Sequence, residues 1–141
     1  MAESVLLSIA ILGLVETTSR LTTRVRWLTS QVKDSDRELS KLGEELEILT
    51  EVLGECNETF RSASSAPASV ERSMNLCVSR HAELMDIVHK DIRRAETTSI
   101  ISRIKTVFRQ QERIIAYNAF RDSVLLLRDL ASEYVYPGLP I

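Results

Sequence analysis

An unbroken alternation of three- and four-residue steps between apolar side chains is the feature that most constrains how this chain can fold. It runs through residues 39–60. Because an α-helix has about 3.6 residues per turn, these steps place all the members on one side of a single helix. The seven residues of this seam are Leu39, Leu42, Leu46, Leu49, Leu53, Cys56 and Phe60. The pattern predicts a helix that buries its seam against other helices of a bundle or against a partner chain.

The remaining chain indicates the same class of fold. Its 141 residues are 44% hydrophobic and 27% charged, which suits one domain, and four glycines and three prolines are too few for a turn-rich β-fold. Polar breaks follow residues 32, 61 and 95, the second of them containing Pro67. We therefore predict an all-α fold, an antiparallel helical bundle of four main helices at about residues 3–30, 35–61, 69–94 and 98–133, with a break allowed in the first or last. The bundle would occupy residues 1–133, and residues 134–141 would begin a linker.

The sequence offers no arrangement of residues that indicates catalysis. GxSxG, Walker-type and HExxH motifs are absent, so we predict no enzymatic activity and no metal, cofactor or small-molecule substrate. Cys56 and Cys77 lie in apolar stripes without CxxC spacing, and we interpret both as core residues of a protein in a reducing compartment. His81 shares an apolar stripe and should be packed, whereas His89 lies off that stripe and should be solvated.

The first fifteen residues hold a dense apolar run that ends at Glu16. No basic residue precedes the run, so we do not interpret it as a secretory signal, and it is shorter than the roughly 20 residues that span a bilayer as a helix. It could be buried as a central bundle helix, lie in a membrane interface, or assemble with copies of itself. Its candidate membrane-insertion residues are Val5, Leu6, Leu7, Ile9, Ile11, Leu12, Leu14 and Val15.

Charge is distributed unevenly along the chain. Residues 34–58 carry nine acids against two bases, residues 90–113 carry seven bases against three acids, and the whole chain has a net charge of −2. The cations could contact anionic lipid headgroups, pair with the acidic helix, or be solvated. Nucleic acid is disfavoured because the few aromatic residues do not interleave with the basic ones. The candidate lipid contacts are Arg20, Arg24, Arg26, Lys90, Arg93, Arg94, Arg103, Lys105, Arg109 and Arg113.

One stretch resembles a known family. It comprises Val32, Lys33, Asp34, Arg37, Glu38, Leu39, Leu42, Glu45, Leu46, Leu49, Val52 and Leu53. This series resembles the HeLo-like N-terminal domains of fungal NLR-type (STAND) proteins, which read approximately V-K-D-A-P-x-E-I-x-x-L-x-x-E-L-x-x-L-x-x-V-L. Ser35 and Asp36 stand where many relatives have Ala and Pro. The likeness extends to Phe108, Arg109, Ile114, Tyr117 and residues 125–127.

The resemblance implies a helical-bundle effector at the front of a larger receptor for innate immunity or heterokaryon incompatibility. In such proteins, as in the related four-helix cell-death domains, an N-terminal helix is exposed on oligomerisation and permeabilises the plasma membrane. Carried to this sequence, that element is residues 5–15. The expected partners are further copies of the chain, as a dimer or homo-oligomer, and anionic lipids. The expected location is the cytoplasm, with relocation to the plasma membrane on activation. The alternative is a non-lytic interaction or dimerisation module that uses the seam or the acidic face of the second helix.

Overall fold

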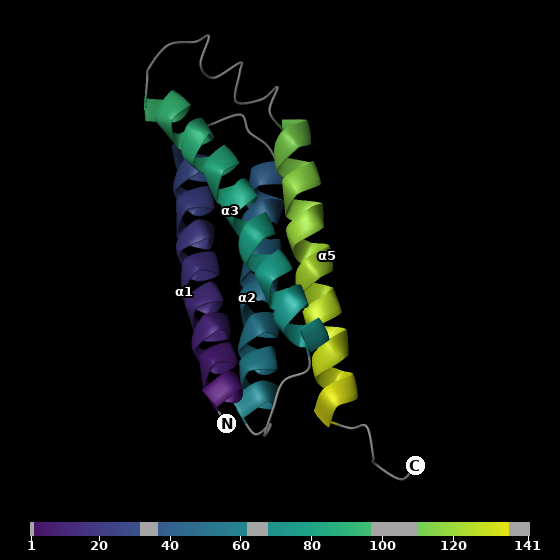
Figure 1. Cartoon of the computed structure of the whole chain (residues 1–141). Coiled ribbons are helices and arrows are strands. Elements are labelled where there is room, and N and C mark those ends of the chain that lie inside the picture. The colour runs from purple at the N-terminus through teal and green to yellow at the C-terminus, as the bar shows by residue number, and fades with distance from the viewer. Residues whose placement is uncertain (1, 32–36, 62–67, 97–109, 136–141) are drawn as a thin grey trace.

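The computed structural model describes residues 2–31, 37–61, 68–96 and 110–135, and all of them are helical. The helices are α1 (Ala2–Gln31), α2 (Arg37–Arg61), α3 (Ala68–Glu96) and α5 (Gln110–Val135). They run alternately up and down, so that α1 begins and α5 ends at the same end of the molecule (Figure 1). The predicted all-α fold, a four-helix bundle, is confirmed.

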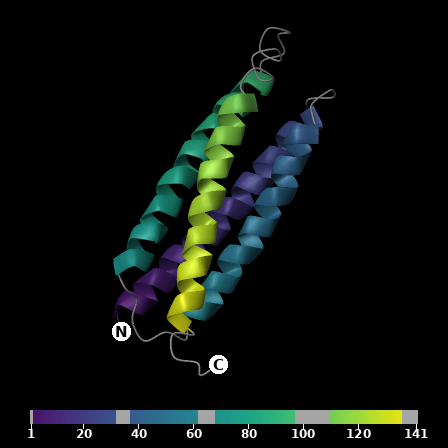
Figure 2. The same cartoon turned by 90° about the vertical axis from the view of Figure 1, so that its right-hand side faces the viewer.

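The bundle consists of two antiparallel pairs of helices (Figure 2). One pair is α1 with α2, the other is α3 with α5, and the pairs pack on each other through α2 with α5 and through α1 with α3. Within the described residues α2 and α3, although consecutive in sequence, make no close backbone contact, and neither do α1 and α5. The first helix therefore has two neighbours, and the interpretation of α1 as a surrounded central helix is wrong.

The seam of α2 lies in the middle of the core. All seven of its residues are buried, as their spacing predicts, and Leu46, Leu53 and Phe60 are completely inaccessible. At about 1.5–3 kcal/mol for each fully buried large apolar side chain, these residues are a main source of the stability of the bundle. Opposite them, the core takes in apolar residues from the other three helices: Leu21, Val25 and Leu28 of α1; Val70, Met74, Leu84 and Val88 of α3; and Phe120, Val124 and Leu127 of α5.

The helix boundaries differ from the predicted ones by a few residues, as is usual where helix ends fray. The second helix begins at Arg37, two residues after the predicted start, and the third ends at Glu96. The last helix is described from Gln110, so residues 98–109 of its predicted span lie outside the described residues. It continues to Val135, two residues into the predicted linker, and residues 136–141 also lie outside the described part.

The cysteines and one histidine are packed as predicted. Cys56 and Cys77 are free and buried. His81 is buried with its ring edge-to-face on Phe120, the ring centroids 5.4 Å apart. The prediction of a solvated His89 is wrong, because the residue is half-buried and its Nε2 atom is shielded from solvent without a hydrogen-bond partner.

Candidate functional site

The structure divides the apolar run of α1 between core and solvent. Leu7, Ile11 and Leu14 are buried, whereas Ile9 is 61% exposed and Leu12 52% exposed. Val15 is half-buried, and the side chains of residues 2–6, including Val5 and Leu6, lie outside the described ones. Burial in the core therefore explains the inner positions of the run but leaves two large apolar side chains in water.

The outer face of α1 changes character along its length. Beyond Ile9 and Leu12 the outward positions become polar, with Glu16 and Arg20 forming an exposed ion pair of 2.6 Å. Trp27, 39% exposed, and Arg24 lie on the outside of the last turns. The first helix thus presents an apolar patch near its start and a cationic region with an aromatic residue near its end.

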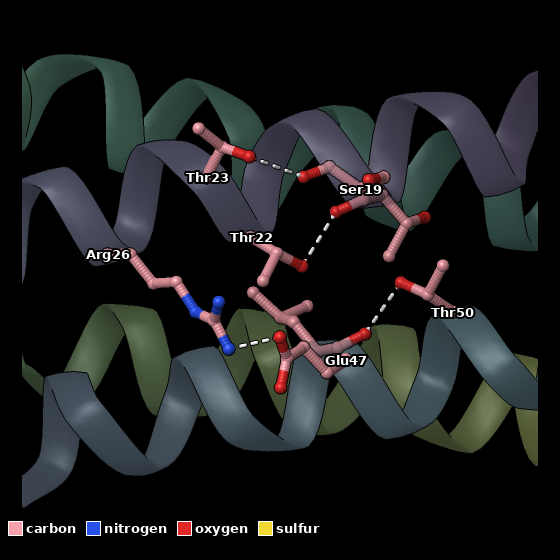
Figure 3. A network of polar contacts seen from close by, with 8 residues as sticks. Ser19, Thr22, Thr23, Arg26, Glu47 and Thr50 are labelled. Atoms are coloured by element: carbon pink, nitrogen blue, oxygen red, sulfur yellow. Dashed lines mark hydrogen bonds and ion pairs between the residues drawn. The ribbon is translucent and has the colours of Figure 1, made fainter.

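A polar groove of about 390 Å³ lies at the boundary between α1 and α2, along the second half of α1 (Figure 3). Its threonine hydroxyls donate to carbonyls of their own helix, Thr22 to Thr18 at 2.9 Å and Thr50 to Leu46 at 2.8 Å. Such bonds satisfy the hydroxyls without linking the two helices. The groove is lined by Ser19, Thr22, Thr23, Arg26, Glu47, Thr50 and Glu51.

Polar contacts cross between α1 and α2 at both ends of their described interface. Arg26 forms an exposed ion pair with Glu47 at the groove, and Ser8 Oγ lies 2.9 Å from Asn57 Oδ1 near the start of α1. An exposed ion pair contributes about 0–1 kcal/mol. The attachment of α1 to α2 therefore depends mainly on the apolar inner face of α1.

The contact between α1 and α3 includes a buried histidine. His81 hydrogen-bonds the backbone of Thr17 on α1 through one ring nitrogen, while its Nε2 is buried without a partner. Burial of the ring lowers the pKa of His81, since a protonated imidazolium would lose its hydration there. The imidazole is thus held neutral between two helices.

Apart from Arg20 in the middle of α1, the described cationic candidates lie toward the end of the bundle away from the N-terminus. Because α1 and α3 run in the same direction, the last turns of both lie together (Figure 1). Arg24 and Arg93 are exposed there, whereas Lys90 pairs with Asp86 at 3.0 Å. Arg94 is half-buried, 4.0 Å from Asp91. Arg103, Lys105 and Arg109 lie outside the described residues.

Arg113 requires a correction. Its side chain is only 3% exposed, and its Nη1 lies 2.6 Å from Oδ2 of Asp91, which is completely buried. In this conformation the guanidinium joins α5 to α3 and is not available to a lipid headgroup. Asp91 was missed by the sequence reasoning, although it follows Leu84 and Val88 in the same four-then-three spacing that marks a buried row.

The two sets of predicted membrane contacts lie far apart. Ile9 and Leu12 are near the start of α1, and Arg24 lies about 20 Å further along the same helix at 1.5 Å per residue. Arg93 lies in the last turn of α3, and α3 ends at the same end of the bundle as α1 (Figure 1). The apolar patch and the cationic end are therefore separate regions of the bundle surface, about 20 Å apart along α1.

The predicted interface on α2 consists of the seam and the acidic residues, and these differ in their exposure. Because the seam is buried, it is closed to a partner chain while the bundle is folded. Of the acidic residues, Glu44, Glu51 and Glu55 are exposed, but Glu45 is half-buried and hydrogen-bonds Tyr117 of α5. Burial raises the pKa of Tyr117, and the negative charge of Glu45 raises it further. Tyr117 and Glu45 thus help to hold α2 against α5.

A second groove, of about 240 Å³, lies between α2 and α5 and was not anticipated from the sequence. Lys41, Glu45 and Arg121 line it, with the guanidinium of Arg121 5.9 Å from the ring centroid of Tyr117. In the part of the chain that the structure describes, no three His, Cys, Asp or Glu side chains gather where they could hold a metal ion. No described helix combines the length and hydropathy that crossing a bilayer requires.

Comparison of the chain with protein-family models, with characterised proteins and with solved structures finds no match.

Proposed function

We propose that this chain is an effector domain that acts on a membrane when copies of it are brought together, and that it causes cell death as the HeLo-like domains do. The observation that carries the proposal is the apolar run of α1, which packs with one side in the core and exposes Ile9 and Leu12 on the other. A helix with apolar residues on both sides of its first turns has more apolar surface than this bundle covers. A membrane interface would cover the rest.

Release of α1 into water would be costly. It would expose a row of core side chains, Leu7, Ile11, Leu14, Leu21, Val25 and Leu28. At about 1.5–3 kcal/mol each, the row contributes roughly 10 kcal/mol or more, comparable with the whole stability of a small domain. The resting domain therefore keeps α1 docked. A bilayer offsets this cost because it shields the same side chains from water. When copies are clustered, the weak membrane binding of each copy adds to that of the others.

The cationic end supplies the first contact in this proposal. Arg24 and Arg93 are exposed there, and so in part is Trp27 in the last turns of α1, a residue type that favours the headgroup level of membranes. Each cation near an anionic surface contributes about 1 kcal/mol, so a few of them attract the folded domain reversibly. Because the apolar patch lies away from this end, we place headgroup contact before the release of α1.

Vesicle leakage tests the proposal. Copies of the chain would be concentrated on dye-filled liposomes that contain a tethering lipid, with and without anionic lipid, and release of the dye would be followed. Ile9→Glu with Leu12→Glu should abolish the leakage without unfolding the domain, since both positions are exposed. Ile48→Glu is the matched control, because Ile48 is 59% exposed but lies on α2. Leakage that survives the double substitution would refute the proposal.

The second candidate is the non-lytic interaction module. The observation that favours it is the exposed apolar surface of α5, where Ile115 and Leu126 are both solvent-accessible. In that case, clustered and folded protein would neither bind nor permeabilise the liposomes, and it would still associate in buffer without lipid.

A further inference from the structure

The first helix contains a glycine that its packing does not explain. Gly13 lies in the interior of α1 and is exposed, and no atom of another described helix comes within 4 Å of the position that a Cβ atom would occupy. Alanine would fit there, and it favours the helical conformation over glycine by about fivefold. The glycine therefore lowers the stability of α1 at this point, and no contact among the described residues requires it.

The hydrogen bonds of the helix are crowded just after Gly13. Oγ1 of Thr18 donates a bond of 2.6 Å to the carbonyl oxygen of Leu14, and Oγ1 of Thr17 donates one of 3.1 Å to the same oxygen. In an α-helix this oxygen also accepts the N–H of residue 18, so three donors share its two lone pairs. Hydroxyls that bond back in this way compete with the helical bonds. We call residues 13–18, where both effects occur, the α1 joint.

The part of α1 before the joint has a small share of the core. Among the side chains of residues 7–12, Leu7 and Ile11 are buried, and Ser8 Oγ lies 2.9 Å from Asn57 Oδ1 on α2. The other positions of this stretch are exposed. The described side chains of this segment therefore attach it to the bundle mainly through two apolar residues.

The part of α1 after the joint is attached more firmly. Leu21, Val25 and Leu28 are completely buried. At the end of the joint, His81 of α3 hydrogen-bonds the backbone of Thr17. The second half of α1 is thus fixed to the core and to α3, and the joint separates it from the weakly held first half.

We propose that α1 opens in two parts, with residues 2–12 moving out of the bundle at the α1 joint while the second half of the helix stays docked. Among the described side chains, this motion takes Leu7 and Ile11 out of the core and leaves the three completely buried residues after the joint in place. Segments with few buried apolar contacts open locally while the rest of a domain stays folded. Opening at the joint therefore costs less than release of the whole helix.

The purpose of this motion rests on the proposed function. The opened segment carries Leu7 and Ile11 from its inner side together with Ile9 and Leu12 from its outer side, so apolar residues all round it become available to a bilayer. Its 11 residues form a helix about 16 Å long, roughly half the thickness of the hydrocarbon layer. The segment can lie in the interface or enter one leaflet without crossing the membrane.

Hydrogen exchange of the whole chain in buffer without lipid tests the joint. Followed by NMR, the amides of residues 7–12 should exchange at a common level of protection, and clearly faster than those of residues 21–28. Gly13→Ala should slow the exchange of residues 7–12 about fivefold, because alanine favours the closed, helical joint. The added methyl group enters open space, so the variant should remain folded, which circular dichroism would check.

Gly54→Ala is the matched control. Gly54 lies inside α2, and there too nothing comes within 4 Å of the Cβ position. The substitution favours the helical conformation of α2 without touching the joint, so it should leave the exchange of residues 7–12 unchanged. If these amides were exposed only when the whole bundle unfolds, both substitutions would slow them equally, and the joint would be refuted. A smooth increase of exchange toward Ala2, without a step at residues 13–18, would be fraying of the helix end and would also refute it.

Two results distinguish the joint from the membrane role. Separate opening of residues 7–12, in a protein whose leakage survives Ile9→Glu with Leu12→Glu, would keep the joint and remove the membrane role. Leakage that depends on these two residues, in a protein whose residues 7–12 do not open separately, would do the reverse.

Discussion

Asp91 of α3 and Arg113 of α5 form an ion pair in the interior of the bundle, with 2.6 Å between Oδ2 and Nη1. Neither charge has water to solvate it, so each stabilises the other. Breaking a buried pair by removing one partner costs about 3–5 kcal/mol, because the remaining charge is left in a poorly solvating environment. The pair therefore fixes the register of α3 against α5 more than it adds net stability.

Arg113→Met should accordingly lower the free energy of unfolding by about 3–5 kcal/mol in urea denaturation. Arg113→Met combined with Asp91→Leu should be closer to the wild-type protein than the single substitution is, because no charge is left unpaired. Arg93→Met on the exposed side of α3 is the control and should change the unfolding free energy by less than about 0.5 kcal/mol. A loss below about 1 kcal/mol for Arg113→Met would contradict the buried pair.

Acid should destabilise the fold through His81. Burial lowers the pKa of this imidazole below its ordinary value of 6.5, so the unfolded chain binds the proton before the folded chain does. Stability is therefore complete above pH 6.5 and falls as the pH drops below it, by at most about 1.4 kcal/mol per pH unit. Urea titrations at a series of pH values should show this slope, and His81→Gln, which does not titrate, should flatten it. An equal slope in the variant would exclude His81 as the cause.

The two cysteines should resist thiol reagents in the native state. Burial raises the pKa of Cys56 to about 11 and raises the pKa of Cys77 as well, so little reactive thiolate exists at neutral pH. An aromatic disulfide reagent should label both thiols rapidly in urea and only slowly in buffer. Fast labelling of the folded protein at pH 7 would show that the core opens often.

The seam of α2 offers a direct comparison of buried and exposed positions two residues apart. Leu46 is completely buried and Ile48 is 59% exposed. Leu46→Ala should lower the free energy of unfolding by about 2–5 kcal/mol, and Ile48→Ala should change it by less than about 0.5 kcal/mol. Thermal and urea unfolding would measure both. Similar losses at the two positions would mean that the seam does not face the core.

The seam could be predicted because helical spacing alone decides which residues share a face. Which helices become neighbours could not be predicted, since periodicity does not show that α2 and α3 lie diagonally opposite one another in the bundle. For that reason the sequence left the surroundings of α1 open, and the outward position of Ile9 and Leu12 became apparent only from the packing. Arg113 illustrates a signal that was present but unused, because it precedes Tyr117 and Phe120 at core spacing. A charge in a core row predicts a buried partner, and only the packing shows that this partner is Asp91.

The docking of α1 can be controlled through the contact between Ser8 and Asn57. Their side chains meet across the interface of α1 and α2, at 2.9 Å, near the apolar run. Ser8→Cys with Asn57→Cys should form a disulfide that ties the start of α1 to α2. If α1 must leave the bundle to act, the oxidised variant should not permeabilise liposomes, and addition of a reductant should restore leakage.

Each single cysteine variant is the control for this experiment, because it carries the substitution without the cross-link. The native cysteines should not interfere, since both are buried and their thiols have raised pKa values. Leakage by the fully oxidised variant at the wild-type rate would mean that α1 acts while docked, through outward residues such as Ile9 and Leu12.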